Sequence, residues 1–294
     1  MDTNNRRLIW CISICAAVIC TAIILSLIPR YLQKTPEVGQ VIAERALPAN
    51  SASVQREEAR WGFPSDGGVP RPGFTVKLNG STRQPDWVLW KVDHSGSINR
   101  SGYSWRNDQN VPVDRRQKAL WYAGTHWHAD GIDHETTDSR LEIGHQKPSD
   151  NSKQSAEIMQ ACMVLEDNLC PQTSRLNQVV WKALESWVTK TSETPTVDVW
   201  CVTGPLWYAE EGDTYTVQVL GDGVPVPTHF FKVCLITHKH SDIELKAWIL
   251  PNTDKPPAGF DDGAVTTARV QQLAGLDFWN AIPDEQETEL ESKK

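Results

Sequence analysis

The chain has 294 residues, of which 39% are hydrophobic and 22% are charged, and its formal net charge at pH 7 is −8. This composition is typical of a globular protein, and the 13 tryptophans exclude an intrinsically disordered chain, which is poor in aromatic residues. The negative charge argues against a polybasic DNA-coating protein, because such proteins bind through many Lys and Arg side chains. It does not argue against an enzyme that meets nucleic acid at one local site.

One segment near the start of the chain is apolar enough to cross a membrane, which excludes a polytopic membrane protein. Residues 8–28 form an uncharged run of the length that spans a hydrocarbon core about 30 Å thick. The run ends in Ser26-Leu27-Ile28-Pro29, which offers no small-residue cleavage site, so we predict an uncleaved anchor behind a stub of residues 1–7 rather than a signal peptide. We expect the large C-terminal part to lie outside the cytoplasm, in the periplasm if the source is a bacterium.

Four cysteines lie outside this apolar segment: Cys162, Cys170, Cys201 and Cys234. None of their spacings is Cys-x-x-Cys, which argues against a zinc knuckle. An oxidising compartment would permit any of the three possible pairings, and buried free thiols are equally compatible with the sequence.

Residues 29–60 are polar and of mixed composition, and we expect them to form a stalk in front of a single domain that covers residues 61–283. Apolar patterning predicts strands at 74–78, 87–92, 197–202, 214–220, 229–236 and 244–250 and helices at 155–163 and 177–190. Because these elements show no regular βαβ order, the predicted class is α+β. The last residues, 284–294, are rich in Glu and are predicted to be a solvated acidic tail.

Two tracts hold most of the residues that could carry chemistry. The first is Leu-Glu-Ile-Gly-His-Gln-Lys-Pro at 141–148, and the second begins with Asn168 and runs through Asn177 to Glu185. Taken singly, these residues are compatible with structural roles; Asn177, for example, could be the N-cap of the predicted helix.

Taken together, the tracts resemble the DNA/RNA non-specific endonucleases, the family of secreted bacterial sugar-non-specific nucleases and mitochondrial endonuclease G. The resemblance extends from about Trp61 to Ile282. Its other marks are Trp61-Gly62-Phe63-Pro64, Arg100-Ser101 with Trp105-Arg106-Asn107-Asp108, Val202-Thr203-Gly204-Pro205-Leu206, Val226-Pro227-Thr228-His229-Phe230-Phe231-Lys232-Val233, Leu250-Pro251-Asn252 and Leu273-Ala274-Gly275-Leu276-Asp277-Phe278. It implies a ββα-metal (His-Me finger) fold with a central, mostly antiparallel sheet flanked by helices.

The resemblance also implies the central residues of an active site. By position, His145 matches the general base that activates water, Asn177 the direct protein ligand of a Mg²⁺ ion, and Glu185 the residue that holds a metal-bound water. Mn²⁺ or another divalent cation could take the place of Mg²⁺. A near-neutral imidazole can make a nucleophile from water, and a hard cation can offset charge on the phosphate.

Other matched residues are expected to support this site. Asn168 matches a residue that orients it, and Arg100, with Arg106 as second choice, matches the arginine that stabilises the phosphate. We also expect Arg106 and Lys147 to contact DNA and RNA substrates, which the family cuts with little sequence preference. Family members are often dimers, so a homodimer is a further expectation.

The chain departs from the family at one important position. The family tetrapeptide that ends in the base is Asp-Arg-Gly-His, whereas this chain has Glu142-Ile143-Gly144-His145. Glu142 retains the carboxylate of the family Asp in the catalytic site. Ile143 lacks the guanidinium of the family Arg, and the loss of its charge-assisted contact is worth roughly 1.5–3 kcal/mol, or one to two orders of magnitude in rate. We therefore predict an active but altered nuclease, and the alternative is an inactive relative that only binds nucleic acid.

A second cluster of polar residues is local to this protein. His126, His128 and His134, with Asp130 and Asp133, lie shortly before the tract that contains His145. They could form a transition-metal site, or act in metal scavenging, because His and Asp are suitable ligands. The alternative is an exposed loop that faces the substrate.

Overall fold

The computed structural model describes residues 56–125, 140–209, 216–238 and 242–294. In this part of the chain no helix is long and apolar enough to cross a bilayer. The predicted stub, the predicted membrane anchor and most of the predicted stalk lie outside the described residues, as do His126, His128 and His134.

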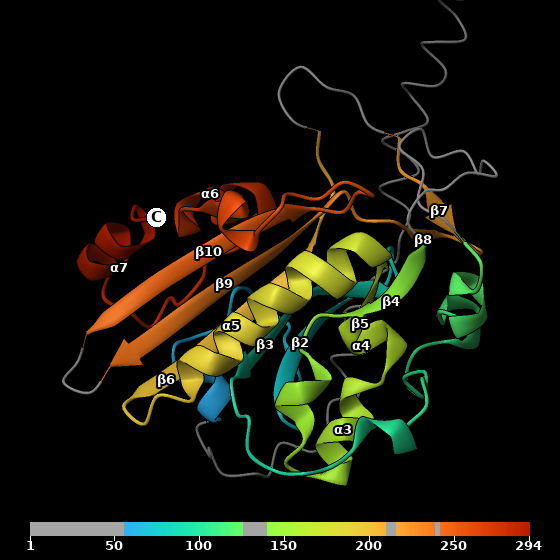
Figure 1. Cartoon of the computed structure of the whole chain (residues 1–294), viewed down its shortest axis with the longest axis horizontal. Coiled ribbons are helices and arrows are strands. Elements are labelled where there is room, and N and C mark those ends of the chain that lie inside the picture. Colours follow the sequence, from blue (N-terminus) through green and yellow to red (C-terminus); the bar gives the residue numbers. More distant parts are fainter. Residues whose placement is uncertain (1–55, 126–139, 210–215, 239–241) are drawn as a thin grey trace, which may run out of the picture. The chain divides into compact units, whose positions relative to one another are not determined.

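The centre of the fold is an antiparallel seven-stranded sheet with the strand order β1-β2-β3-β6-β9-β10-β11 (Figure 1). Its strands are β1 (Val69–Arg71), β2 (Phe74–Asn79), β3 (Gln84–Lys91), β6 (Val197–Leu206), β9 (His229–His238), β10 (Ile243–Pro251) and β11 (Ala264–Val265). Five of the predicted strands fall in this sheet. The sixth, at 214–220, is confined among the described residues to β7 (Val219–Leu220), which pairs with β8 (Val224–Pro225) apart from the main sheet.

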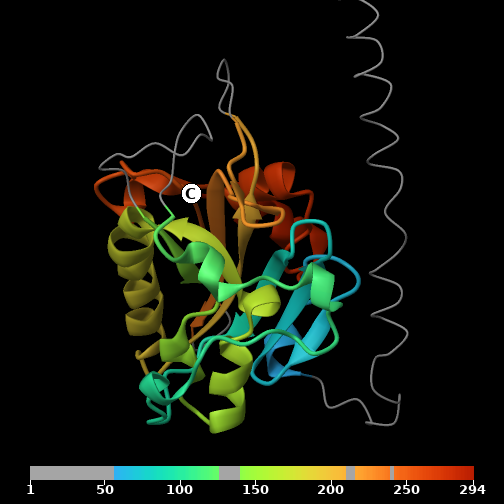
Figure 2. The same ribbon diagram turned by 90° about the vertical axis from the view of Figure 1, so that its right-hand side faces the viewer.

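Side chains along each strand point alternately to the two faces of the sheet, and each face carries its own buried apolar cluster. Trp90 lies in the cluster that α5 (Lys182–Ser192) covers, whereas Trp87 lies in the cluster on the other face. That second face carries α6 (Thr267–Ala274) and α7 (Asp284–Glu291), so helices flank the sheet on both sides (Figure 2). The predicted α+β class with a central antiparallel sheet is confirmed.

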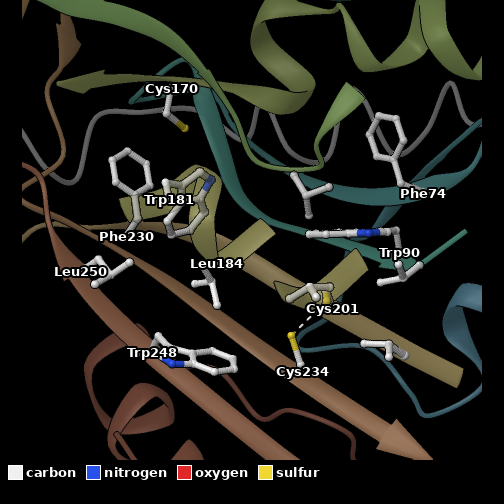
Figure 3. Close-up of a cluster of buried hydrophobic side chains, with 14 of the residues drawn as sticks. Phe74, Trp90, Cys170, Trp181, Leu184, Cys201, Phe230, Cys234, Trp248 and Leu250 are labelled. Carbon is white, nitrogen blue, oxygen red and sulfur yellow. Dashed lines mark hydrogen bonds between the residues drawn. The ribbon is translucent and has the colours of Figure 1, made fainter. Parts of the chain in front are cut away.

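The first of these clusters joins the helix to the middle of the sheet. Trp181 and Leu184 are fully buried and point toward the strands that carry Leu250, Cys201 and Cys234 (Figure 3). Cys201 and Cys234 are direct partners in the β6–β9 register, and their Sγ atoms are 3.0 Å apart. The structure therefore brings two of the domain's four cysteines, Cys201 and Cys234, into contact.

The domain extends beyond its predicted boundaries at both ends. Most residues of the predicted solvated acidic tail, 284–294, are exposed, but residues 284–291 form the helix α7. Its first turn is acidic, which suits the positive end of the helix dipole, and Leu290 is only 9% exposed in the second cluster. At the other end, the indole N–H of Trp200 donates to the carbonyl oxygen of Glu57 over 2.8 Å, so residues assigned to the stalk belong to the fold.

A separate two-stranded antiparallel sheet carries the tract that ends in His145. It consists of β4 (Leu141–His145) and β5 (Leu169–Thr173), and His145 lies opposite Leu169. Between them the chain forms α3 (Ala156–Cys162) and α4 (Leu165–Asn168). After β5 comes a helix that includes the π-helical segment η6 (Leu176–Trp181) and continues as α5 beside the hairpin (Figure 1). This is the ββα order that the family resemblance predicts.

One buried side chain attaches this hairpin to the main sheet. Asn252 follows β10, and its Oδ1 accepts a hydrogen bond from the backbone N–H of Thr173 over 2.8 Å. Its Nδ2 donates to the carbonyl oxygens of Pro171 over 3.1 Å and Pro227 over 2.9 Å. The hairpin is thus held against the end of the large sheet through a side-chain amide.

Candidate active site

His145 is the last residue of β4, and the backbone around it is closely fitted to β5. A Cβ atom at Gly144 would lie 2.0 Å from Oε1 of Gln172, so this position leaves room for glycine only. The chain can therefore pass close to β5 just before it presents the imidazole.

Asn168 fixes the backbone immediately after His145. Its Oδ1 accepts from the N–H of Lys147 over 2.7 Å, and its Nδ2 donates to the carbonyl oxygens of Lys147 over 2.9 Å and Cys162 over 3.0 Å. The backbone N–H of Gln146 also donates to the carbonyl oxygen of Asn168 over 2.8 Å. Since Asn168 is fully buried, these bonds fix the backbone at the end of the strand that carries His145.

The imidazole of His145 is partly buried and is the neutral form near pH 7. Burial, together with the positive charges of Arg100 and Lys147, lowers the pKa of His145 to about 3, while Asp150 acts in the opposite direction. The Nε2 atom is buried and has no hydrogen-bond partner among the described residues. A neutral imidazole with an unpartnered nitrogen can accept a proton.

The side chain of Asn177 is oriented by a carboxylate on the same strand as His145. Its Nδ2 donates to Oε2 of Glu142 over 2.7 Å, and Nε2 of Gln178 donates to the same oxygen over 2.7 Å. Because a carboxylate only accepts hydrogen bonds, it selects the amide orientation that turns the Oδ1 of Asn177 away from it. That oxygen remains available as a ligand.

Glu185 lies in α5, about two turns beyond Asn177, and has an unpartnered buried oxygen. Oε1 of Glu185 makes no hydrogen bond within the described part of the chain. Burial raises the pKa of the Glu185 carboxyl to about 7; the Lys232 ammonium acts against this, and Asp150 adds to it. Asp150 acts electrostatically on both His145 and Glu185, and the hydrogen bond from Asn177 to Glu142 joins the strand that carries His145 to the helix that carries Glu185.

These oxygen atoms fit a divalent cation. An amide oxygen of Asn177 and a carboxylate oxygen of Glu185 are the hard donors that Mg²⁺ and similar ions prefer. A cation there would offset the cost of a buried, ionised Glu185, which is otherwise left with an unpartnered oxygen. Asn177 and Glu185 are therefore the residues that would hold a metal or its bound water.

Arg100 and Trp105 form the other wall of the site. The indole ring of Trp105 lies 5.3 Å from the imidazole ring of His145, measured between centroids, and the guanidinium carbon of Arg100 lies 4.7 Å from the indole centroid. Arg106, next in sequence, is exposed and approaches Oε1 of Gln160 at 3.4 Å. The sequence interpretation gave Trp105 no role, although its place in a tract shared with the family was a usable signal.

Three sequence-based expectations need correction or context. The expected contact of Lys147 with nucleic acid is wrong, because Lys147 is 1% exposed and its ammonium donates inward to the carbonyl oxygen of Asn151 and, over 2.5 Å, to Oγ of Ser152. Asn177 is not an N-cap, since Ser174, Arg175 and Leu176 before it are already helical. Ile143 is partly buried and packs with Trp121 against an apolar cluster, which consists of Tyr122, Leu141, Leu220, Val224 and Val226.

A buried lysine behind the site escaped the sequence interpretation as well. Lys232 in β9 is 1% exposed, and its Nζ lies 4.9 Å from the ring centroid of Trp90 and 4.5 Å from that of Trp181. Its charge acts on Glu185, as described above. The signal in the sequence was a charged residue inside the otherwise apolar strand tract Phe230-Phe231-Lys232-Val233, because lysine is almost never fully buried without a partner.

The fold and this arrangement of residues define a ββα nuclease-type site. The model of the DNA/RNA non-specific endonuclease family matches residues 57–285, and the chain belongs to this family. It is therefore an enzyme of the hydrolase class that acts on nucleic acid.

Several characterised proteins are similar to the chain over most of its length. It is 28% identical to the mitochondrial nuclease EXOG of Xenopus laevis over 268 residues, which cover 85% of this chain and 66% of the relative. It is 29% identical to mitochondrial endonuclease G of Bos taurus, covering 85% and 83% of the two chains, and 24% identical to the nuclease of Serratia marcescens, covering 79% and 82%. A chain in the crystal structure of the EndoG/EndoGI complex superposes with a TM-score of 0.67 at 22% identity, over 80% of this chain and 96% of that one.

Proposed function

We propose that the chain is a divalent-cation-dependent endonuclease that hydrolyses phosphodiester bonds in both DNA and RNA with little sequence preference. We also propose that residues 8–28 anchor it in a membrane with the catalytic domain outside the cytoplasm. One observation supports the catalytic part most: Nε2 of His145 has no partner at the end of the β4–β5 hairpin, and Glu142 on the same strand orients Asn177, on the helix that carries Glu185. Support also comes from the names of its relatives, endonuclease G among them.

The residues divide the work of hydrolysis between them. Nε2 of His145 accepts a proton from a water molecule, whose oxygen attacks phosphorus as the bond to the leaving oxygen breaks. Arg100 offsets the negative charge on the phosphate. A divalent cation, when bound, supplies further positive charge for the phosphate and the leaving oxygen, and Asn177 and Glu185 are oriented to hold it or its water. Glu142 keeps Asn177 in the orientation that this requires.

The alternative is a relative that binds nucleic acid without cutting it, because Ile143 stands where the family has Arg. One assay separates the two: full-length protein in detergent is incubated with supercoiled plasmid and with RNA, in Mg²⁺ and in EDTA. We expect both substrates to be cut in Mg²⁺ and neither in EDTA. Retention of both substrates on the protein without cleavage would support the binding module instead. The expected homodimer stays a prediction, and sedimentation of the same preparation tests it.

A further inference from the structure

Trp105 lies between two side chains of the proposed site that are distant in sequence. One contact joins its indole to the imidazole of His145, with 5.3 Å between centroids and 49° between ring planes. The other joins it to the guanidinium of Arg100, 4.7 Å from the indole centroid. The indole is thus in a position to determine where the guanidinium lies relative to the imidazole.

The backbone next to Trp105 is held by the same segment that supports His145. Arg106 donates its N–H to the carbonyl oxygen of Met163 over 3.1 Å and accepts from the N–H of Leu165 over 2.8 Å. Leu165 begins α4, which ends at Asn168, and Asn168 fixes the chain behind His145. Both walls of the site are therefore positioned by one short helix, and the indole can hold a fixed distance to the imidazole.

Arg100 contacts the indole, and no carboxylate in the described part of the chain pairs with it. Within the described residues its guanidinium makes no ion pair and no hydrogen bond, so the aromatic face is the contact that orders it. A guanidinium held by a ring keeps its N–H donors free for an anion such as phosphate, whereas a carboxylate would occupy them. Ile143 packs into an apolar cluster and supplies no cation of its own.

We infer that Trp105 is a positioning residue that holds the guanidinium of Arg100 beside His145, where it binds the phosphate in a site whose position 143 supplies no cation. The inference rests on the proposed function, because it assigns Arg100 to the phosphate. Burial is the main cause of the low pKa of His145, and the charge of Arg100 lowers this pKa further, which supports the proximity of the two side chains.

A double-mutant cycle on the full-length protein tests this coupling. The variants are Trp105→Leu, Arg100→Gln and the double variant, with Trp105→Phe as the conservative replacement. We expect Trp105→Leu to lower kcat about 10-fold with a smaller change in KM, because the contact to phosphate strengthens as charge develops. Trp105→Phe should recover most of the rate. If Trp105 acts through Arg100, the double variant is no slower than Arg100→Gln within about 2-fold.

A matched control removes a similar pair far from the site. Arg60 lies 5.2 Å from the ring centroid of Trp61, on the face of the sheet that α6 and α7 cover. Trp61→Leu therefore removes a cation–π contact of the same kind and should leave kcat unchanged at a temperature at which the variant is folded. A double variant whose loss in kcat equals the product of the losses in Trp105→Leu and Arg100→Gln would overturn the inference.

A second readout does not depend on cleavage. The Nε–Hε resonance of Arg100, identified by its loss in Arg100→Gln, should be displaced by the ring current of the indole in metal-free protein. We expect Trp105→Leu to return it to the position of exposed arginines and Trp105→Phe to keep part of the displacement. An unaltered resonance in Trp105→Leu would overturn the positioning role. If the parent protein cuts no substrate, the proposed function fails, and this resonance alone decides whether Trp105 positions Arg100.

Discussion

Glu142 binds the side-chain amide of Asn177 over 2.7 Å, and this contact joins the strand that carries His145 to the helix that carries Glu185. The carboxylate at this family position therefore orients the side chain of Asn177. Gln178 donates to the same oxygen, also over 2.7 Å, so one carboxylate fixes two neighbouring side chains at the start of the helix.

Asn177→Ala should raise the Mg²⁺ concentration needed for half-maximal cleavage and lower the maximal rate, because it removes an oxygen ligand. The matched control is Gln178→Ala, which removes the neighbouring hydrogen bond to Glu142 but no expected ligand. Cleavage is measured over a Mg²⁺ titration for both variants. An unchanged titration midpoint in Asn177→Ala would show that Asn177 does not bind the metal.

His145→Ala should cut at less than a tenth of the parent rate while it still folds and binds Mg²⁺, since the imidazole acts on water and not on the metal. The measurement combines plasmid cleavage with thermal unfolding and with Mg²⁺ binding by calorimetry. Residual cleavage above a tenth of the parent rate would exclude His145 as the base.

The same variant should change the pH dependence of stability. Burial and the nearby cations lower the pKa of His145 to about 3, against about 6.5 in the unfolded chain. Below pH 6.5 the unfolded chain therefore binds a proton that the folded chain does not, and the free energy of unfolding falls as the pH drops toward 3. His145→Ala removes this contribution, so its stability should fall less steeply between pH 6.5 and 4.5 in denaturant titrations. Parallel pH curves for parent and variant would contradict the low pKa.

Ile143→Arg should destabilise the protein without speeding cleavage. Ile143 packs with Trp121 against an apolar cluster, and a guanidinium there loses solvation at a cost of about 1–3 kcal/mol. Ile143→Val, which costs about 1 kcal/mol through lost packing alone, is the control. Thermal unfolding and plasmid cleavage on the same preparations decide the matter. A rate gain of about 10-fold at an unchanged melting temperature would show instead that the site accepts the family arginine.

Cys201 and Cys234 should form a disulfide when the chain folds in the presence of oxidised glutathione. They are direct cross-strand partners with Sγ atoms 3.0 Å apart, and both are fully buried. The two thiols lose their hydrogens to the glutathione disulfide, which leaves as two thiols. Burial raises the pKa of the Cys201 thiol well above its usual range, so the pair reacts during folding rather than afterwards.

Peptide mapping after alkylation in denaturant checks this pairing. We expect a linked peptide pair from the two core strands and alkylated Cys162 and Cys170. Cys201→Ser should abolish the linked pair, and Cys170→Ser should leave it intact. Alkylation of both Cys201 and Cys234 after oxidative folding would contradict the prediction.

Much of the fold follows from local patterns in the sequence. The strand at 229–236 and the helix at 177–190 were predictable because the first is almost wholly apolar and the second has one apolar stripe. The helix at 284–291 was not, because its acidic residues hide a single apolar anchor, Leu290, whose partners come from distant parts of the chain.

The site shows the same division between local and distant information. His145, Asn177 and Glu185 were recognisable from their spacing within the family pattern, and the structure places them at one hairpin and its helix. The inward turn of Lys147 was not recognisable, because it depends on acceptors in the following loop. The contact between Trp105 and His145 joins segments 40 positions apart, and no periodicity in the sequence encodes it.

The amide of Asn252 has a consequence for the placement of His145. It forms hydrogen bonds with the backbone of Thr173 and Pro171 in β5 and with the carbonyl oxygen of Pro227. Among the described residues, the strands of the hairpin are not hydrogen-bonded to any strand of the large sheet. The position of the hairpin, and with it of His145, therefore depends on side-chain contacts and not on a shared strand ladder. A change at Asn252 is expected to alter the placement of the imidazole before it alters the strand pairing of either sheet.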